Sequence, residues 1–121
     1  MKITKFEDIE AWKEARILVK KLYTITGELK DFAFVNQITR AAVSVMSNIA
    51  EGFDRSSNKE FIQYLVDSRG SVSEVKSLLY VALDNGYINN SAFVELTDRC
   101  DRISGLLNGF IRYLRNSDRK S

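Results

Sequence analysis

The sequence predicts an all-α fold, an antiparallel up-down-up-down four-helix bundle, and two observations carry this prediction. The chain contains no proline, the residue that most often kinks or ends a helix, so long uninterrupted helices are favoured. Apolar residues also recur at steps of three and four in four stretches joined by short polar links. Four such stripes are all buried when the helices lie side by side with sequential neighbours antiparallel.

The first two stripes predict the first two helices. Helix 1 is expected over roughly residues 7–28, with Thr4 and Glu7 placed to form a capping box at its start. Helix 2 is expected to begin after Asp31, a good N-cap residue, and to run to about Gly52.

The other two helices follow from equally local signals. Ser57 and Glu60 predict a capping box that opens helix 3 near residue 58, and Gly86 predicts its end with a residue in the left-handed region. Helix 4 is expected after the polar link 87–91 and ends near Arg115. The expected core consists of Ile9, Trp12, Ala15, Leu18, Val19, Leu22, Tyr23, Ile25, Phe34, Ile38, Ala41, Ala42, Val45, Met46, Ile49, Ala50, Phe61, Leu65, Val72, Val75, Leu78, Leu79, Ala82, Phe93, Leu96, Cys100, Ile103, Leu106, Leu107, Phe110, Ile111 and Leu114.

Length and composition predict one domain over residues 1–121, in which about residues 116–121 form a polar tail. The only cysteine, Cys100, cannot form an internal disulfide and is expected to be a small core residue. No apolar run approaches the roughly 18 residues that span a bilayer, and charges follow the first methionine too soon for a signal peptide. We therefore expect no membrane contact and a cytoplasmic location.

The absence of histidine restricts the chemistry that the chain can perform. It removes the commonest general base and metal ligand, every Ser-His or Cys-His arrangement, and the Glu-x-x-His pairs of di-metal bundles. No glycine-rich phosphate loop is present either. We expect no cofactor, no metal and no enzymatic activity. One enzymatic alternative stays open, in which Asp67, Glu74 and Arg40 act in acid–base catalysis, because carboxylates alone can catalyse.

Two rows of polar or small residues lie at helical spacing in the middle of the chain. The row on helix 2 is Gln37, Arg40, Ser44, Asn48 and Glu51, and the row on helix 3 is Glu60, Gln63, Asp67, Gly70, Ser71 and Glu74. Two interpretations stay open: the rows meet each other in a network of satisfied polar contacts, or they form a subunit interface or ligand surface.

Basic residues gather in two places, and they are the candidate contacts to a phosphate backbone. Residues 112–121 hold a net charge of +3, whereas the whole chain holds +2, so the remainder is slightly acidic. Solvated helix faces also carry such charges, and a net +2 is far from the balance of dedicated nucleic-acid proteins. The candidates are Lys13, Arg16 and Lys20 on one face of helix 1, and Arg112, Arg115 and Arg119 at the end of helix 4.

A combination of motifs resembles one bacterial family. The motifs are Phe6 with Ile9 and Trp12, residues 37–42 (QITRAA), residues 48–52 (NIAEG), residues 55–61 (RSSNKEF), Gly70-Ser71 with Glu74, and Gly86-Tyr87-Ile88. Over about residues 6–114 the chain resembles the four-helix bundles named for proteins encoded in intervening sequences of 23S ribosomal RNA genes. It is similar also to the accessory variability protein of diversity-generating retroelements.

The resemblance implies a bundle that assembles into closed rings of identical subunits, expected to be pentamers, with a basic surface that binds RNA or DNA. It implies no catalytic role. Our leading hypothesis is therefore a homo-oligomer that binds nucleic acid through repeated basic faces. The alternative is a scaffold that docks a partner enzyme without touching nucleic acid. The motif residues expected at an interface are Gln37, Arg40, Asn48, Glu51, Gly52, Arg55, Gly70, Ser71 and Glu74.

Overall fold

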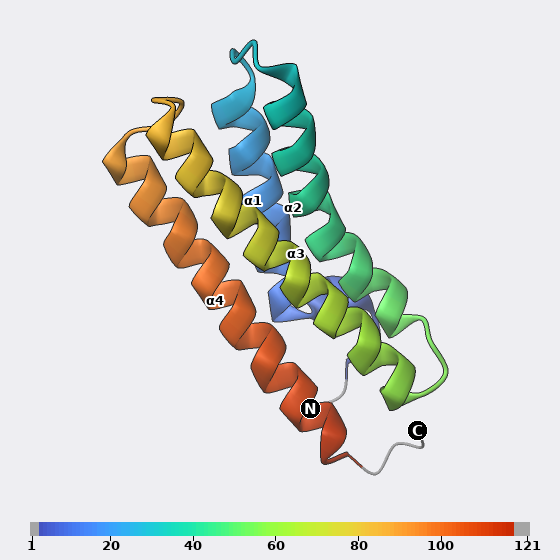
Figure 1. The fold of residues 1–121 in the computed structure, drawn as a ribbon. Coiled ribbons are helices and arrows are strands. Elements are labelled where there is room, and N and C mark those ends of the chain that lie inside the picture. Colours follow the sequence, from blue (N-terminus) through green and yellow to red (C-terminus); the bar gives the residue numbers. More distant parts are fainter. Residues whose placement is uncertain (1–2, 118–121) are drawn as a thin grey trace.

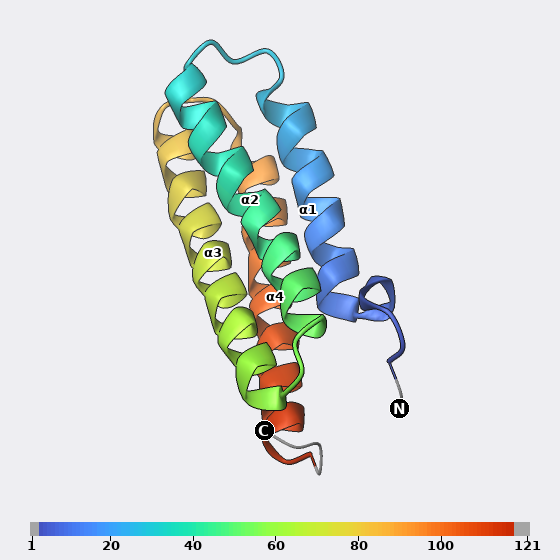
Figure 2. The ribbon, with the colours of Figure 1, turned by 90° about the vertical axis from the view of Figure 1, so that its right-hand side faces the viewer.

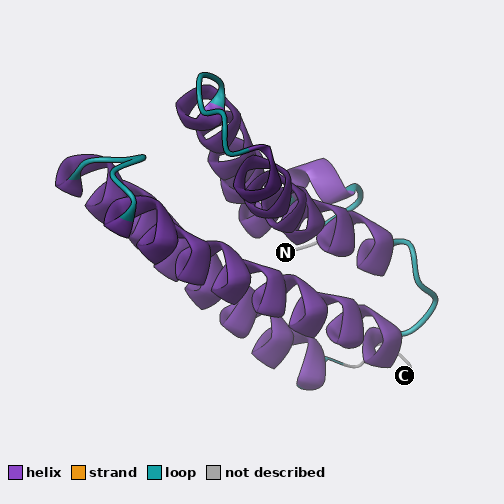
Figure 3. Cartoon of the chain, turned by 45° about the horizontal axis from the view of Figure 1, so that its top comes forward, coloured by secondary structure: helices purple, strands orange, loops and turns teal. Residues whose placement is uncertain are grey.

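The structure, a computed structural model, describes residues 3–117 and confirms the predicted four-helix bundle. A single turn of 3-10 helix, η1 (Phe6–Asp8), precedes the four long helices. These are α1 (Glu10–Thr26), α2 (Phe32–Phe53), α3 (Asn58–Asp84) and α4 (Asn90–Arg115). Short loops join them, and the described part of the chain contains no strand (Figure 3).

The helices pack in cyclic order, so that each contacts its neighbours in sequence and α4 also contacts α1. The helices α2 and α4 run in the same direction and occupy diagonally opposite corners, with no contact between them (Figures 1 and 2). The helices α1 and α3 run the other way. This is the up-down-up-down arrangement that short links impose on antiparallel neighbours.

The N-terminus departs from the prediction. Ile9 has an extended backbone (φ −77°, ψ 122°), so α1 begins only at Glu10 and no side chain caps it. The predicted capping box of Thr4 and Glu7 is wrong, because Glu7 belongs to η1 and no side chain caps that turn either. The break at Ile9 turns the chain back so that the rings of Phe6 and Trp12 meet edge to face at 5.2 Å.

The predicted signals at the other helix ends are confirmed where they are local. Asp31 accepts a hydrogen bond from the Phe34 N–H at 3.2 Å, and Ser57 accepts one from the Glu60 N–H at 3.2 Å. The N-cap at Ser57 is thus confirmed, but the other half of the predicted capping box is wrong, because the Glu60 carboxylate accepts no hydrogen bond from the Ser57 N–H. Gly86 has φ 71°, the left-handed conformation that follows many helices. Asp31 also accepts a 2.7 Å hydrogen bond from the Tyr87 hydroxyl, which ties the α1–α2 loop to the α3–α4 loop.

Most residues of the predicted core are buried, and others, such as Trp12 and Phe110, are only partly buried and pack against it. Ala11 and Ile88 are buried although the stripes did not include them. Tyr23 is 55% exposed, so its assignment to the core is wrong. It lies at the edge of the α1 stripe, where an amphipathic ring satisfies the spacing without entering the core. Cys100 is completely buried as predicted, and burial raises the pKa of its thiol to about 12. Among residues 3–117, no helix combines the length and apolar character that crossing a bilayer requires.

Candidate nucleic-acid interface

The basic face of α1, formed by Lys13, Arg16 and Lys20, lies on the outside of the bundle with all three residues exposed. Lys13 Nζ lies 3.5 Å from Glu10 Oε1, and the Arg16 guanidinium lies 5.9 Å from the centre of the Trp12 ring. The Lys20 side chain has no hydrogen-bond or ion-pair partner among the described residues. Because α-helical residues three and four apart are neighbours, the three cations form one compact patch.

Arg112 and Arg115 lie elsewhere, exposed on the last turn of α4, where cations also favour the helix dipole. An ion pair of 2.9 Å between Lys21 Nζ and Glu95 Oε2 places the C-terminal half of α1 beside the start of α4. Lys20 is therefore about 25 Å along the bundle from Arg112, at 1.5 Å per residue. By the same register Lys13, at the other end of the basic face, is about 13 Å along the bundle from Arg112. The predicted cations therefore lie on two different helices, and Arg119 lies outside the described residues.

Sequence analysis missed Lys59 as a member of the patch at the end of α4. Lys59 stands in the first turn of α3, and it lines the same surface hollow as Arg115, Asn58 and Gln63. The signal was available in principle, because an up-down-up-down bundle brings the start of helix 3 beside the end of helix 4.

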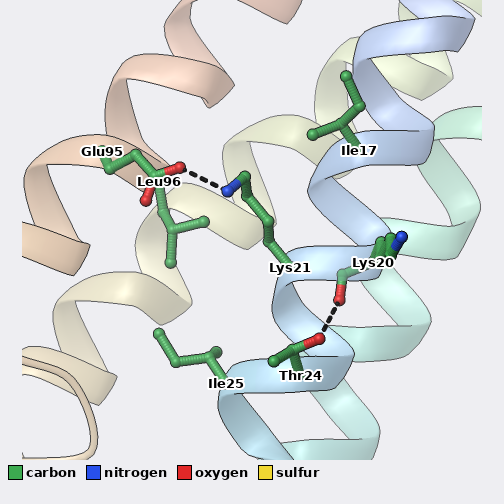
Figure 4. A pocket seen from close by; sticks show the side chains of 7 residues that line it. All are labelled: Ile17, Lys20, Lys21, Thr24, Ile25, Glu95 and Leu96. Carbon is green, nitrogen blue, oxygen red and sulfur yellow. Dashed lines mark hydrogen bonds and ion pairs between the residues drawn. The ribbon is translucent and has the colours of Figure 1, made fainter.

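A groove of about 570 Å³ opens between α1 and α4 beside Lys20 (Figure 4). Ile17, Ile25 and Leu96 form its apolar lining, and the Lys21–Glu95 ion pair crosses it. Hydrogen bonds from Lys21 and then Arg99 lower the pKa of Glu95. The basic face of α1 is therefore bordered by a groove with both apolar and charged walls.

The two polar rows meet each other at their centre. The hydroxyl oxygens of Ser44 and Ser71 are 2.9 Å apart, and Asn48 Nδ2 donates to Ser44 O at 2.9 Å and Ser44 Oγ at 3.0 Å. These three residues form a polar network between α2 and α3. At these three residues the first interpretation is confirmed, because the two polar rows contact each other.

Outside that network the rows remain at the surface. Gln37, Arg40 and Glu74 are exposed and line a groove of about 390 Å³ between α2 and α3. Glu51 is exposed farther along α2. These side chains stay available to a partner.

Gly52 and Arg55 stabilise the junction between α2 and α3. A Cβ atom at Gly52 would lie 2.7 Å from Tyr64 Cβ and 2.8 Å from Phe61 Cδ1, so only glycine fits. Arg55 donates a 2.7 Å hydrogen bond to the Tyr64 hydroxyl, and its guanidinium lies 4.8 Å from the centre of that ring. We therefore read these two motif residues as structural.

Gly70, Gly105 and Gly109 are different, because a Cβ atom at any of them would meet no described atom within 4 Å. Close packing inside the bundle therefore does not explain these glycines.

The residues of the enzymatic alternative do not share one site. Asp67 accepts a 3.3 Å hydrogen bond from Gln63 and does not line the groove that contains Arg40 and Glu74. Among the described residues, no group of three or more Asp, Glu, Cys or His side chains could hold a metal ion.

Comparisons with known proteins support the fold and give it a family context. The family model described as 23S rRNA-intervening sequence protein matches residues 7–109. A crystal structure from Bacteroides thetaiotaomicron, described as a protein of unknown function from the S23 ribosomal protein family, superposes with a TM-score of 0.78. It is 22% identical in sequence, and the match covers 84% of this chain and 98% of that one. No curated protein matches the sequence.

Proposed function

The chain belongs to the 23S rRNA-intervening sequence protein family, and from this premise we propose that it is a non-enzymatic, homo-oligomeric bundle that binds RNA or DNA through the basic face of α1. The observation that carries the proposal is the exposed patch of Lys13, Arg16 and Lys20. Three cations on one helix face match the repeated charge of a phosphate backbone.

One subunit offers a weak site, and oligomerisation strengthens it. Three phosphate contacts give a salt dependence with a log–log slope of about −2.7 on duplex DNA, so affinity falls roughly 40-fold between 50 and 200 mM salt. A closed ring, which we expect to be a pentamer, presents the patch once per subunit, and simultaneous contacts multiply the affinity.

The test compares two double variants with equal changes in net charge. Lys13→Glu with Lys20→Glu removes the proposed contacts, whereas Lys30→Glu with Lys59→Glu changes two exposed lysines outside the patch. Lys59 lies on α3, which does not contact α1. Fluorescence anisotropy with short RNA, duplex DNA and a hybrid, at 50 and 200 mM salt, is expected to show at least tenfold weaker binding for the first variant only. Equal binding by both variants, or no binding by the parent at low salt, contradicts the proposal.

The groove formed by Gln37, Arg40 and Glu74 favours a second function, a scaffold that docks a partner enzyme without touching nucleic acid. Polar side chains at an open groove suit a specific protein contact. Under this alternative, a purified partner enzyme binds the parent chain in the absence of nucleic acid and fails to bind Glu74→Arg. Nucleic-acid binding that is lost in the α1 variant argues against it.

A further inference from the structure

The helix α2 is poor in charge compared with its neighbours. It has 22 residues, of which only Arg40 and Glu51 are charged, whereas six of the 17 residues of α1 are charged. Between these two charges the outer face of α2 carries the uncharged, partly exposed residues Val43 and Ser47. Charge depletion at the centre of a surface, with charges at its rim, is typical of a protein–protein interface.

The charges at the rim of α2 have no partners within the described chain. Arg40, Glu51 and Asp54 are exposed, and none forms an ion pair or side-chain hydrogen bond with a described residue. Asp54 follows the helix with φ −81° and ψ −1°, so it continues the helical line. We define the α2 face by the residues Arg40, Val43, Ser47, Glu51 and Asp54. Its three charges are positive, negative and negative along the helix, and they are separated by 11 and three residues.

The outer face of α4 carries the opposite signs at the same intervals. Asp101, Arg112 and Arg115 are exposed and give the order minus, plus, plus. Asp101 bonds to Lys76 at 2.7 Å but keeps 61% of its side chain exposed, and neither arginine forms an ion pair with a described residue. Together with Gly105 and Asn108 between them, these three residues define the α4 face.

We propose that the α2 face of one subunit packs in parallel against the α4 face of a second copy of this chain. Eleven residues of α-helix are three turns and span about 16.5 Å on either helix, so all the charges come into register together. The pairs are Arg40 with Asp101, Glu51 with Arg112, and Asp54 with Arg115. Gly105, where a Cβ atom would meet no described atom, lets the two backbones approach closely.

The direction and symmetry of this contact follow from the fold. An antiparallel arrangement of the two faces would set Arg40 against Arg112 and Glu51 against Asp101, so like charges exclude it. Because α2 and α4 point the same way and lie at opposite corners of one subunit (Figure 1), each copy offers both faces at once. Such a heterologous contact repeats into a ring or a filament in which all copies point the same way.

This inference rests on the homo-oligomeric part of the proposed function and sharpens it. It assigns Arg112 and Arg115 to the contact between subunits rather than to phosphates. The basic face of α1 stays outside the contact, so an assembly presents it at regular intervals.

Charge reversal with cross-rescue tests the pairing. Light scattering is expected to show an oligomer for the parent chain, and at least about tenfold weaker association for Arg40→Glu and for Asp101→Arg, because each sets like charges together. The double variant Arg40→Glu with Asp101→Arg restores the oligomer. Lys30→Glu, an equal change in charge at an exposed loop residue, leaves association unchanged.

Two further outcomes overturn the proposal. If Glu51→Arg, rather than Asp101→Arg, rescues Arg40→Glu, then α2 pairs with α2 across a twofold axis. A monomeric parent chain, or single variants that associate like the parent, also contradicts it. The anisotropy experiment measures nucleic-acid binding independently of association. If a monomeric chain binds nucleic acid, the proposed contact between subunits is wrong, whereas the proposed binding site on α1 is supported.

Gly105→Leu gives a second readout that does not depend on charge. Gly105 is exposed and a Cβ atom there would meet no described atom within 4 Å, so circular dichroism is expected to show a folded bundle of at least parental stability. The added side chain separates the two helix backbones at the proposed contact, so association is lost. An oligomer that forms as in the parent contradicts the close approach at Gly105.

Discussion

The seam between α2 and α3 and the seam between α1 and α4 lie on opposite sides of one bundle, and they are built differently. Across the α2–α3 seam, Gly52 packs on Tyr64 and Phe61, and the buried Ser68 hydroxyl donates to Val45 O at 2.7 Å. No ion pair between described residues crosses it. Shape and buried hydrogen bonds hold this seam.

The α1–α4 seam depends on charge. Glu14 lies 3.5 Å from both Arg99 and Arg102, and Lys21 pairs with Glu95. The groove of about 570 Å³ and a smaller hollow of about 240 Å³ beside Phe110 lie along this seam. Close packing is sensitive to a single methyl group, whereas ion pairs respond to salt and pH, so the two seams should respond to different perturbations.

The largest expected effect is at the closely packed seam. Gly52→Ala places a methyl group 2.7 Å from Tyr64 Cβ, and overpacking should lower the free energy of unfolding by about 2 kcal/mol. The matched control is Gly70→Ala on the exposed side of α3, where the same change should raise it by up to about 1 kcal/mol through helix propensity. Urea denaturation measures both. If both substitutions raised the free energy of unfolding, the side chains of Tyr64 and Phe61 would have moved to accommodate the methyl group at residue 52.

A smaller effect is expected at the charged seam. Glu14→Gln removes the carboxylate that faces Arg99 and Arg102, and it should lower the free energy of unfolding by about 0.5–1 kcal/mol at low salt. Screening should reduce the difference at 1 M salt, whereas the effect of Gly52→Ala should persist. Denaturation of both variants at the two salt concentrations checks this. A salt-independent loss in Glu14→Gln would mean that packing, not charge, holds α1 to α4.

The smallest effect concerns pH. Hydrogen bonds from Lys21 and then Arg99 hold the pKa of Glu95 below its ordinary value of 4.5 in the folded protein. A carboxylate with a lowered folded pKa stabilises the fold above its unfolded pKa, and this contribution is lost as pH falls through the folded value. Thermal melts of the parent and Glu95→Gln between pH 7 and pH 3 should therefore converge in acid. If the melting temperatures of the two proteins instead differed by the same amount at every pH, ionisation of Glu95 would not contribute to the stability of the fold.

Sequence reasoning succeeded where the physical signal is local. The caps at Asp31 and Ser57, the left-handed Gly86 and the buried stripes depend on residues within a few positions of one another. The helical period therefore sufficed for the bundle and for most of its core.

The failures have physical reasons of two kinds. The extended backbone at Ile9 has no glycine or proline to announce it, and it accompanies a contact between the Phe6 and Trp12 rings that the helical period does not predict. The Glu14–Arg99 ion pair joins residues 85 positions apart, which no helical spacing reveals. For the candidate site, spacing predicted the exposed face of α1 but not its separation from Arg112, since that distance depends on the register between helices.

Because Cys100 is buried, the rate at which its thiol is labelled measures how often the bundle opens. The thiol is inaccessible at the centre of α4, and with a pKa of about 12 it carries almost no reactive thiolate at neutral pH. A thiol reagent can modify it only while α4 is displaced from the bundle. The kinetics of thiol labelling on the unaltered chain therefore report the frequency of local unfolding around α4. This measurement needs no probe on the basic face of α1 or on the α2 and α4 faces.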